Sequence, residues 1–329
     1  MKPKIREKSH PRPKNKFVVD ADNGHAFNAA VWPYVTSVGR LACRRSGALR
    51  IFDVNRKLLI MKNNFTRPAR ILFAIPWIIF GIQHFMYADF VATLVPAYMP
   101  VRIFWVYLTA IAMIAAGISF IIDRKVKLAA TLLGIMLSIF ILLIHTATLA
   151  ADWHSGIHWT RALQDITITG AAFALASISG GETPGVRSSF VVVGKIDLVT
   201  AARYLYAFPL IFLGAQHFMG LAFVTGKIPE YLPAKTLWDY LMGSLIIVAA
   251  ISLLLNKKAM LSAMILGFVL LLFALLLHGP LLVTNIKNGL DWTGAMLDLA
   301  IAAGAFLVAD SLPRTAEGRS GELAEYNIG

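Results

Sequence analysis

Eight apolar segments, each close to the length that crosses a bilayer, constrain this chain more than any other feature. They lie at about 70–88, 102–122, 128–150, 160–179, 203–224, 236–255, 259–283 and 292–311. A helix needs about 20 residues to cross the hydrocarbon, and backbone groups in lipid must find partners within their own segment. The chain has 57% hydrophobic and 15% charged residues and a mean hydropathy of +0.67, which excludes an ordinary soluble domain. The sequence predicts an all-α polytopic membrane protein with eight transmembrane helices.

The eight segments form two copies of one four-helix pattern. Gly-Ile-Gln-His-Phe-Met at residues 81–86 returns as Gly-Ala-Gln-His-Phe-Met at 214–219, an offset of 133 residues (217 minus 84). The same offset relates Arg70 to Arg203, Pro76 to Pro209, His145 to His278 and Asp165 to Asp298. Four helices bring the two ends of a copy to the same side of the membrane. We therefore expect two parallel repeats.

Charge separates a tail from the body of the chain. Residues 1–66 contain 14 Lys and Arg against 4 Asp and Glu, whereas the remaining residues contain 17 against 14. We expect a basic, disordered tail at 1–66, a repeat at 67–180, a cytosolic linker at 181–199, a second repeat at 200–311 and a polar tail at 312–329. Because Met61 begins a short polar lead into the first apolar segment, translation could start at Met1 or at Met61.

The basic residues between the segments predict the orientation. Twelve lie on the side of the termini, and five lie opposite, namely Arg102, Arg161, Lys227, Lys235 and Lys287. By the positive-inside rule both termini are cytosolic, which indicates a multi-pass protein of the bacterial inner membrane. The expected surroundings are the lipid bilayer, and no nucleic-acid partner is expected because the basicity is confined to the tail. The one cysteine, Cys43, excludes an intrachain disulfide and a four-thiolate iron–sulfur site.

Polar side chains inside the segments are the candidate functional residues. At a rise of about 1.5 Å per residue, the histidines and the aspartate of each repeat fall at similar depths in the outer half of the membrane. Ionisable groups at such depths mark ligand sites or proton relays. The expected relay or head-group residues are His84, His145, Asp165, His217, His278 and Asp298, and the expected cofactor-binding residues are Gln83, His84, Gln216 and His217. No metal site is expected.

Three interpretations of these residues stay open. In the first, each His and Asp is a structural contact between helices. In the second, they bind the head group of a quinone and relay its protons, because His titrates near neutral pH. In the third, His84 with His145, and His217 with His278, are axial ligands of a haem b in each repeat. A non-enzymatic small-molecule carrier or lipid-binding protein is the alternative to a redox role.

The chain resembles the DoxX-like family of four-helix membrane proteins, here in two fused copies. The resemblance rests on the arginine before the first helix, the basic turn between the second and third helices, and the Gly-x-x-His-Phe ending of the first helix at Gly81, His84 and Phe85, with Gly214, His217 and Phe218 in the second copy. It implies a membrane component associated with a quinone-linked oxidoreductase, such as thiosulfate:quinone oxidoreductase or a terminal oxidase, together with a soluble or membrane redox partner. Whether this chain is itself an enzyme is left open.

Overall fold

The computed structural model describes residues 17–19, 26–28, 47–179, 197–219, 231 and 233–312, with side chains from residue 66 onward. The chain divides into two compact units, Met1–Met61 and Lys62–Gly329. The expected linker at 181–199 and the expected polar tail at 312–329 lie outside the described residues except at their edges.

The first unit contains two short strands. Strand β1 (Phe17–Val19) pairs antiparallel with β2 (Ala26–Asn28), so that Val18 lies opposite Phe27. Helix α1 spans Gly47–Met86 and so begins well before residue 70. After Gly47 no glycine or proline interrupts the chain before Pro68, which favours continuing the helix backwards from the membrane segment. Residues 1–16, 20–25 and 29–46 of the expected tail lie outside the described residues, and the expectation of a disordered tail stays a prediction.

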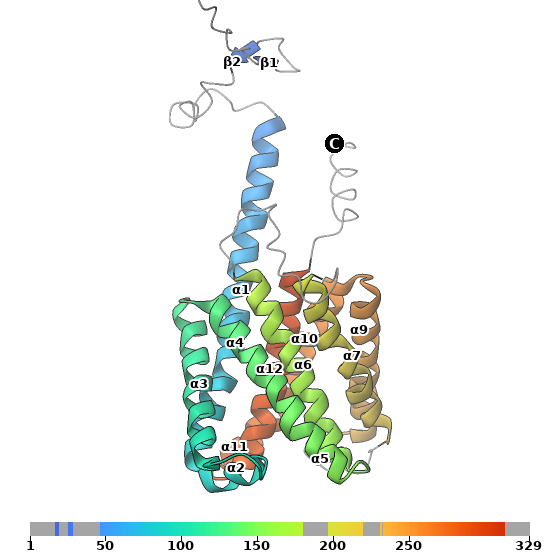
Figure 1. Cartoon of the computed structure of the whole chain (residues 1–329). Coiled ribbons are helices and arrows are strands. Elements are labelled where there is room, and N and C mark those ends of the chain that lie inside the picture. Colours follow the sequence, from blue (N-terminus) through green and yellow to red (C-terminus); the bar gives the residue numbers. More distant parts are fainter. Residues whose placement is uncertain are drawn as a thin grey trace, which may run out of the picture. The chain divides into compact units, whose positions relative to one another are not determined.

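The second unit is an all-α bundle (Figure 1). After the membrane part of α1, its first half contains α2 (Ala88–Leu94), α3 (Arg102–Ile122), α4 (Val126–Phe140), the π-helical segment η2 (Ile141–His145), α5 (Thr146–Ala151) and α6 (Gly156–Ile178). Its second half contains α7 (Leu198–Met219), α9 (Lys235–Leu255), α10 (Ala259–Phe273), the π-helical segment η3 (Ala274–His278), α11 (Gly279–Thr284) and α12 (Gly289–Ser311).

Helix bounds in the two halves differ by the sequence offset. Adding 133 to the bounds of α3, α4, η2, α5 and α6 gives those of α9, α10, η3, α11 and α12. Helices α1 and α7 end at the equivalent residues Met86 and Met219. Figure 1 shows α3 and α9 at opposite sides of the bundle, with α6 and α12 between them.

Seven helical segments of the described chain are long and apolar enough to cross a membrane: Thr66–Met86, Arg102–Ile122, Val126–Ala151, Leu198–Met219, Lys235–Leu255, Ala259–Thr284 and Gly289–Ser311. Seven of the eight expected segments are thus confirmed as candidate spans, and the protein is polytopic. Helix α6 has 23 residues but is not among them. Its first half contains Arg161, Gln164 and Asp165, which lower its mean hydropathy.

Tight turns connect α3 to α4 and α9 to α10. Asp123 and Asn256 end α3 and α9 in the left-handed region, with φ of 59° and 54°, which Asp and Asn tolerate better than most residues. Buried arginines tie the first helix of each half to this end of the bundle. Arg70 is paired with Asp123, and Arg203 donates to the Leu253 carbonyl at 3.1 Å.

The helices at the centre of the bundle contact one another through small residues. Helix α6 packs against α4, α7 and α12, and α12 packs in turn against α10 and α7. A Cβ atom added to Gly170 of α6 would lie 2.4 Å from the Tyr206 backbone nitrogen of α7, and one added to Gly304 of α12 would lie 2.6 Å from the Ala171 Cβ of α6. Glycine at these positions lets the helices approach almost to backbone contact.

Candidate functional site

His145, the last residue of η2, and Asp165 of α6 form a pair. Nε2 of His145 donates to Oδ2 of Asp165 at 2.8 Å. The side chains are only 14% and 22% exposed. The structure thus brings together the imidazole and the carboxylate that depth alone had placed at one level, and it does so inside the bundle.

The second half of the bundle contains the equivalent pair. Nε2 of His278 donates to Oδ2 of Asp298 at 2.9 Å. His278 is 18% exposed, but Asp298 is 43% exposed although it lies nine residues past Gly289, the first residue of α12. Nδ1 of His278 is buried and has no hydrogen-bond partner in the described part of the chain. This pair therefore has unused hydrogen-bonding capacity at both of its members.

His145 and His278 are each the last residue of a π-helical segment. Helix α4 changes to π-helical hydrogen bonding over Ile141–His145, and α10 does so over Ala274–His278. Short π-helical segments within α-helices are rare and occur frequently at functional sites. The apolar sequence of these segments gave no signal for the change, because it depends on the hydrogen-bond register and not on composition.

His84 and His217 are engaged elsewhere. Nδ1 of His84 donates to the Phe80 carbonyl of its own helix at 2.8 Å, whereas Nδ1 of His217 lies 2.5 Å from Oδ1 of Asp239. Asp239 belongs to α9 and its side chain is fully buried, with Oδ2 lacking a hydrogen-bond partner within the described residues. Sequence reasoning missed Asp239. The available signal was an aspartate inside an apolar helix where the first repeat has Val106.

The two glutamines join the halves of the bundle. Nε2 of Gln83, on α1, donates to the Gly289 carbonyl of α12 at 3.0 Å. Reciprocally, Thr160 of α6 donates to Oε1 of Gln216, on α7, at 3.0 Å. Thr293, the equivalent of Thr160, donates to Oε1 of Gln83 at 3.4 Å. The glutamines thus contact a neighbouring helix, and their expected role in binding a cofactor stays a prediction.

Arg161 is the second residue that the sequence analysis did not place in the site, because it was counted with the loop charges. It lies on α6, one turn before Asp165. Its guanidinium donates to Oε1 of Gln164 at 3.3 Å. The equivalent residue in α12 is Gly294, whose added Cβ would lie 3.3 Å from Cε1 of His278.

Among the described residues, no group of three or more His, Cys, Asp or Glu side chains could hold a metal ion. A haem between His84 and His145 would need a free ring nitrogen on each. Hydrogen bonds to Phe80 and Asp165 occupy Nδ1 of His84 and Nε2 of His145, so the opposite nitrogens would have to serve.

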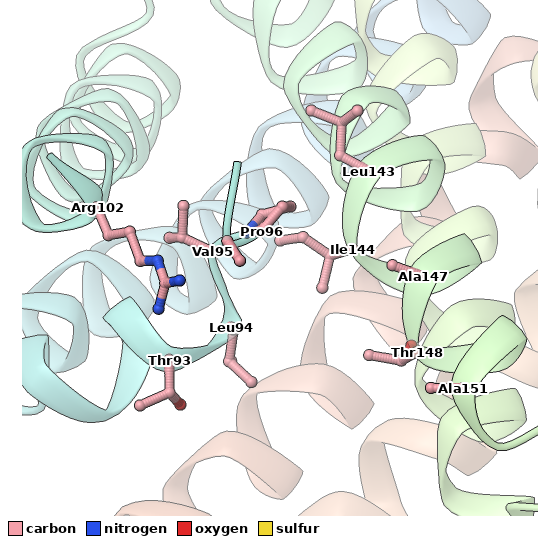
Figure 2. Close-up of a pocket in the computed structure, with 11 residues that line it drawn as sticks. Thr93, Leu94, Val95, Pro96, Arg102, Leu143, Ile144, Ala147, Thr148 and Ala151 are labelled. Carbon is pink, nitrogen blue, oxygen red and sulfur yellow. The ribbon is translucent and has the colours of Figure 1, made fainter. Parts of the chain in front are cut away.

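An open pocket of about 260 Å³ lies beside the first pair, on another side of the same helix. Figure 2 shows Arg102 of α3 extending toward it from one wall, with Ile144 and Ala147 on the facing wall. Its other lining residues are apolar or threonine: Thr93, Leu94, Val95, Pro96, Ala97, Leu143, Thr148 and Ala151. His145 and Asp165 do not line this pocket, so it is separate from the pair.

Comparisons of the chain with protein-family models, with curated proteins and with solved structures find no match.

Proposed function

We propose that this protein is an inner-membrane component of DoxX-like type, with eight spans in two tandem four-helix repeats, that binds the head group of a quinone-type carrier and exchanges protons with it through its His–Asp pairs. In this proposal the chain works with a soluble or membrane redox partner that supplies or removes the electrons. The one cysteine, Cys43, leaves thiol redox chemistry to that partner. Both termini are placed in the cytosol on the basis of loop charges.

The tandem architecture is supported by reciprocal contacts. Gln83 reaches the first turn of α12, and Gln216 meets the first turn of α6. Ala171 and Gly304 occupy equivalent positions and face one another. Residues at equivalent positions contact each other where a two-fold axis passes. These contacts are those expected of two repeats related by a pseudo-two-fold axis along the membrane normal.

Helix α6 is proposed as the eighth span. At about 1.5 Å per residue, 23 residues reach roughly 35 Å, enough to cross the hydrocarbon. Its polar residues are no obstacle because they are partly covered by neighbouring helices. Asp165 has His145 as a partner, and Arg161 donates to Oε1 of Gln164. Ionisable side chains within membrane segments are expected to be paired and to face the interior of the bundle.

One observation carries the functional proposal, namely the second His–Asp pair, which is only partly covered. Asp298 is 43% exposed at a depth of about 13 Å along α12, and Nδ1 of His278 lacks a partner within the described chain. Lipid tails cannot hydrogen-bond the exposed carboxylate of Asp298, so leaving it against hydrocarbon would be costly. A polar head group fits this need, and an imidazole paired with a carboxylate can accept or release a proton near neutral pH.

The proposal is tested by organic extraction of the detergent-purified protein followed by mass spectrometry. We expect a quinone in the wild type and in the Asp291→Asn variant, whose carboxylate is exposed at the outer end of α12 and paired with Asn288. We expect it to be lost from Asp298→Asn at equal folded yield. Bulk phospholipid alone in all three proteins would overturn the proposal.

A non-enzymatic lipid-binding role is the second candidate, and the pocket beside α5 favours it. Arg102 has no hydrogen bond or ion pair within the described residues, and the pocket that it faces is otherwise apolar apart from two threonines. The hydroxyls of Thr93 and Thr148 are already bonded to the carbonyls of Phe90 and His145. An anionic amphiphile matches one cation beside apolar walls. Loss of a specific anionic lipid from Arg102→Gln, with no quinone in any variant, would favour this candidate.

A further inference from the structure

We infer that the pocket beside α5 takes one anionic phospholipid per chain, and that only the first repeat takes it because Tyr231 and Pro280 close the equivalent place in the second. The class of ligand rests on the lipid-binding candidate described above. The restriction to one repeat goes beyond that candidate, since a duplicated chain would be expected to bind two lipids alike. It is independent of whether the His–Asp pairs bind a quinone.

The pocket lies where a phospholipid head group meets the helices. Its lining includes Arg102, the first residue of α3, and Ala151, the last residue of α5, so it is at the outer end of the bundle. Among the described residues that line it, Arg102 alone is charged. The beginning of a helix also carries a partial positive charge. A lipid phosphate would therefore be attracted to this end of α3, while its acyl chains would lie against apolar walls.

The size of the pocket favours part of a large ligand over a whole small one. Its volume of about 260 Å³ is below the roughly 300 Å³ or more of sites that enclose a small molecule. Leu94, in its wall, is 46% exposed, so apolar surface continues from the pocket toward the lipid. A phospholipid can place its head group beside Arg102 and leave the rest of its chains in the bilayer, which a free phosphate ion cannot do.

The second repeat has a bridge at the equivalent place. Tyr231, in the segment before α9, donates its hydroxyl to the carbonyl of Leu276 in η3. The equivalent carbonyl in the first repeat belongs to Leu143, which lies on the pocket wall opposite Arg102 (Figure 2). The equivalent tyrosine is Tyr98, which is 72% exposed and whose hydroxyl has no hydrogen bond in the described part of the chain. Only the second repeat thus has its tyrosine tied to the π-helical segment.

A proline accounts for this difference. In an α-helix each N–H donates to the carbonyl four residues earlier, but Pro280 has no N–H. The carbonyl of Leu276, four residues before it, therefore needs another donor, which the tyrosine hydroxyl supplies. The first repeat has Ala147 at the position of the proline, and its N–H is available to the carbonyl of Leu143. Tyr98 then has no free carbonyl to bind, and the pocket beside it stays open.

Native mass spectrometry of the detergent-purified full chain with added phosphatidylglycerol tests the site. We expect one tightly bound lipid per chain in the wild type. Arg102→Gln should bind it about tenfold more weakly or less, because a charge-assisted hydrogen bond is lost. Lys287→Gln, which removes an exposed cation from the same end of the bundle, should bind as the wild type does. Equal binding by these two variants, or displacement of the lipid by inorganic phosphate, would overturn the site.

Pro280→Ala tests the restriction to the first repeat. The substitution gives the Leu276 carbonyl a backbone donor and favours the helix, so the bridge from Tyr231 is no longer required. The second repeat retains a cation, because Lys235 is equivalent to Arg102. We expect two bound lipids per chain in this variant. A count of one in Pro280→Ala, or of two in the wild type, would overturn the restriction.

Ala147→Pro is the reciprocal change. It frees the Leu143 carbonyl, so we expect Tyr98 to bond to it and lipid binding to fall to the level of Arg102→Gln. Adding Tyr98→Phe removes the hydroxyl and should restore binding, which would not happen if the proline had simply damaged the fold. Wild-type binding by Ala147→Pro would show that the tyrosine does not close the pocket.

The outcomes also separate this inference from the functions proposed above. A wild type that binds no anionic lipid would overturn the lipid-binding candidate and the inference together. One lipid per chain that neither proline substitution changes would overturn only the roles of the two tyrosines. Quinone in the organic extract is a separate measurement, and its absence would overturn the His–Asp proposal while leaving the lipid count as it is.

Discussion

The first and second repeats hold the same residue types in the same helices but surround them with different charges. Each has a histidine that ends a π-helical segment and donates to an aspartate one helix away. The first repeat contributes Arg161 where the second has Gly294, and the second contributes Asp239 where the first has Val106. The helical frame positions the pairs, while a few unmatched residues decide their electrostatics.

The central packing differs between the repeats as well. Gly170 of α6 meets the backbone of α7, whereas the equivalent position in α12 is Ala303. On α7, Tyr206 donates its hydroxyl to the Ile301 carbonyl of α12 at 2.8 Å, whereas α1 has Phe73 at that position. The contact of α6 with α7 is thus closer than its counterpart can be. Substitutions that make one repeat resemble the other measure how much each difference contributes to the free energy of unfolding.

The largest effect is expected for Gly170→Ala, which gives α6 the residue of α12. The new Cβ would lie 2.4 Å from the Tyr206 nitrogen and 2.7 Å from the Ala202 oxygen, and backbone atoms cannot move aside as a side-chain tip can. Overpacking costs about 3 kcal/mol, against a gain of about 1 kcal/mol from removing a glycine from a helix. We expect a net loss of about 2 kcal/mol in the free energy of unfolding, measured by denaturant titration in mixed micelles.

Gly156→Ala is the matched control for this substitution, because no atom lies within 4 Å of its added Cβ. Its free energy of unfolding should stay close to that of the wild type. A Gly170→Ala protein as stable as Gly156→Ala would show that α6 and α7 can separate without cost. The difference between the two repeats in central packing would then have no effect on stability.

A smaller effect is expected for Tyr206→Phe, which gives α7 the residue of α1. The ring remains packed, and only the hydrogen bond to Ile301 is removed. Hydrogen bonds between membrane helices contribute about 0.6 kcal/mol on average, and the stability should fall by about that amount. Tyr204→Phe is the control, since Tyr204 is 44% exposed. A loss as small as the control's would mean that the hydroxyl contributes nothing to joining α7 and α12.

Much of the fold follows from the sequence. The thickness of the lipid bilayer sets the length of the apolar segments, and the duplication gives the 133-residue offset between the two repeats. The shared depth of His145 and Asp165 also follows, since helical rise is nearly constant. The exact helix ends follow less well. Helix α1 extends back to Gly47, in a region whose charge alone gave no sign of a helix.

The electrostatics of the site could not be predicted, because they depend on which helices touch. Arg161 near the end of an apolar segment is indistinguishable from a loop cation until α12 is placed beside α6. Asp239 stands out as an unmatched carboxylate only when α9 is compared with α3, which has Val106 at the equivalent position. Likewise His84 has the same neighbours in sequence as His217, and the different partners of these two histidines arise from one residue on another helix.

The smallest effect is expected for Asp239→Val, which rebuilds the first repeat's arrangement in the second. The substitution removes the partner of His217, but it also removes a buried carboxylate oxygen without a partner among the described residues. His217 can then donate to the Leu213 carbonyl, four residues earlier, as His84 donates to Phe80. Replacing a buried polar pair with apolar atoms is often neutral, so we expect a change within about 0.5 kcal/mol.

Asp239→Ala is the informative companion, because it differs from Asp239→Val only in leaving a space. It should be less stable than Asp239→Val by about 1 kcal/mol. A loss of about 3 kcal/mol or more in both variants would contradict the carbonyl alternative. That result would mean that His217 depends on the carboxylate of Asp239 and does not turn to the carbonyl of its own helix. The two histidines that look alike in sequence would then differ in which partner they require.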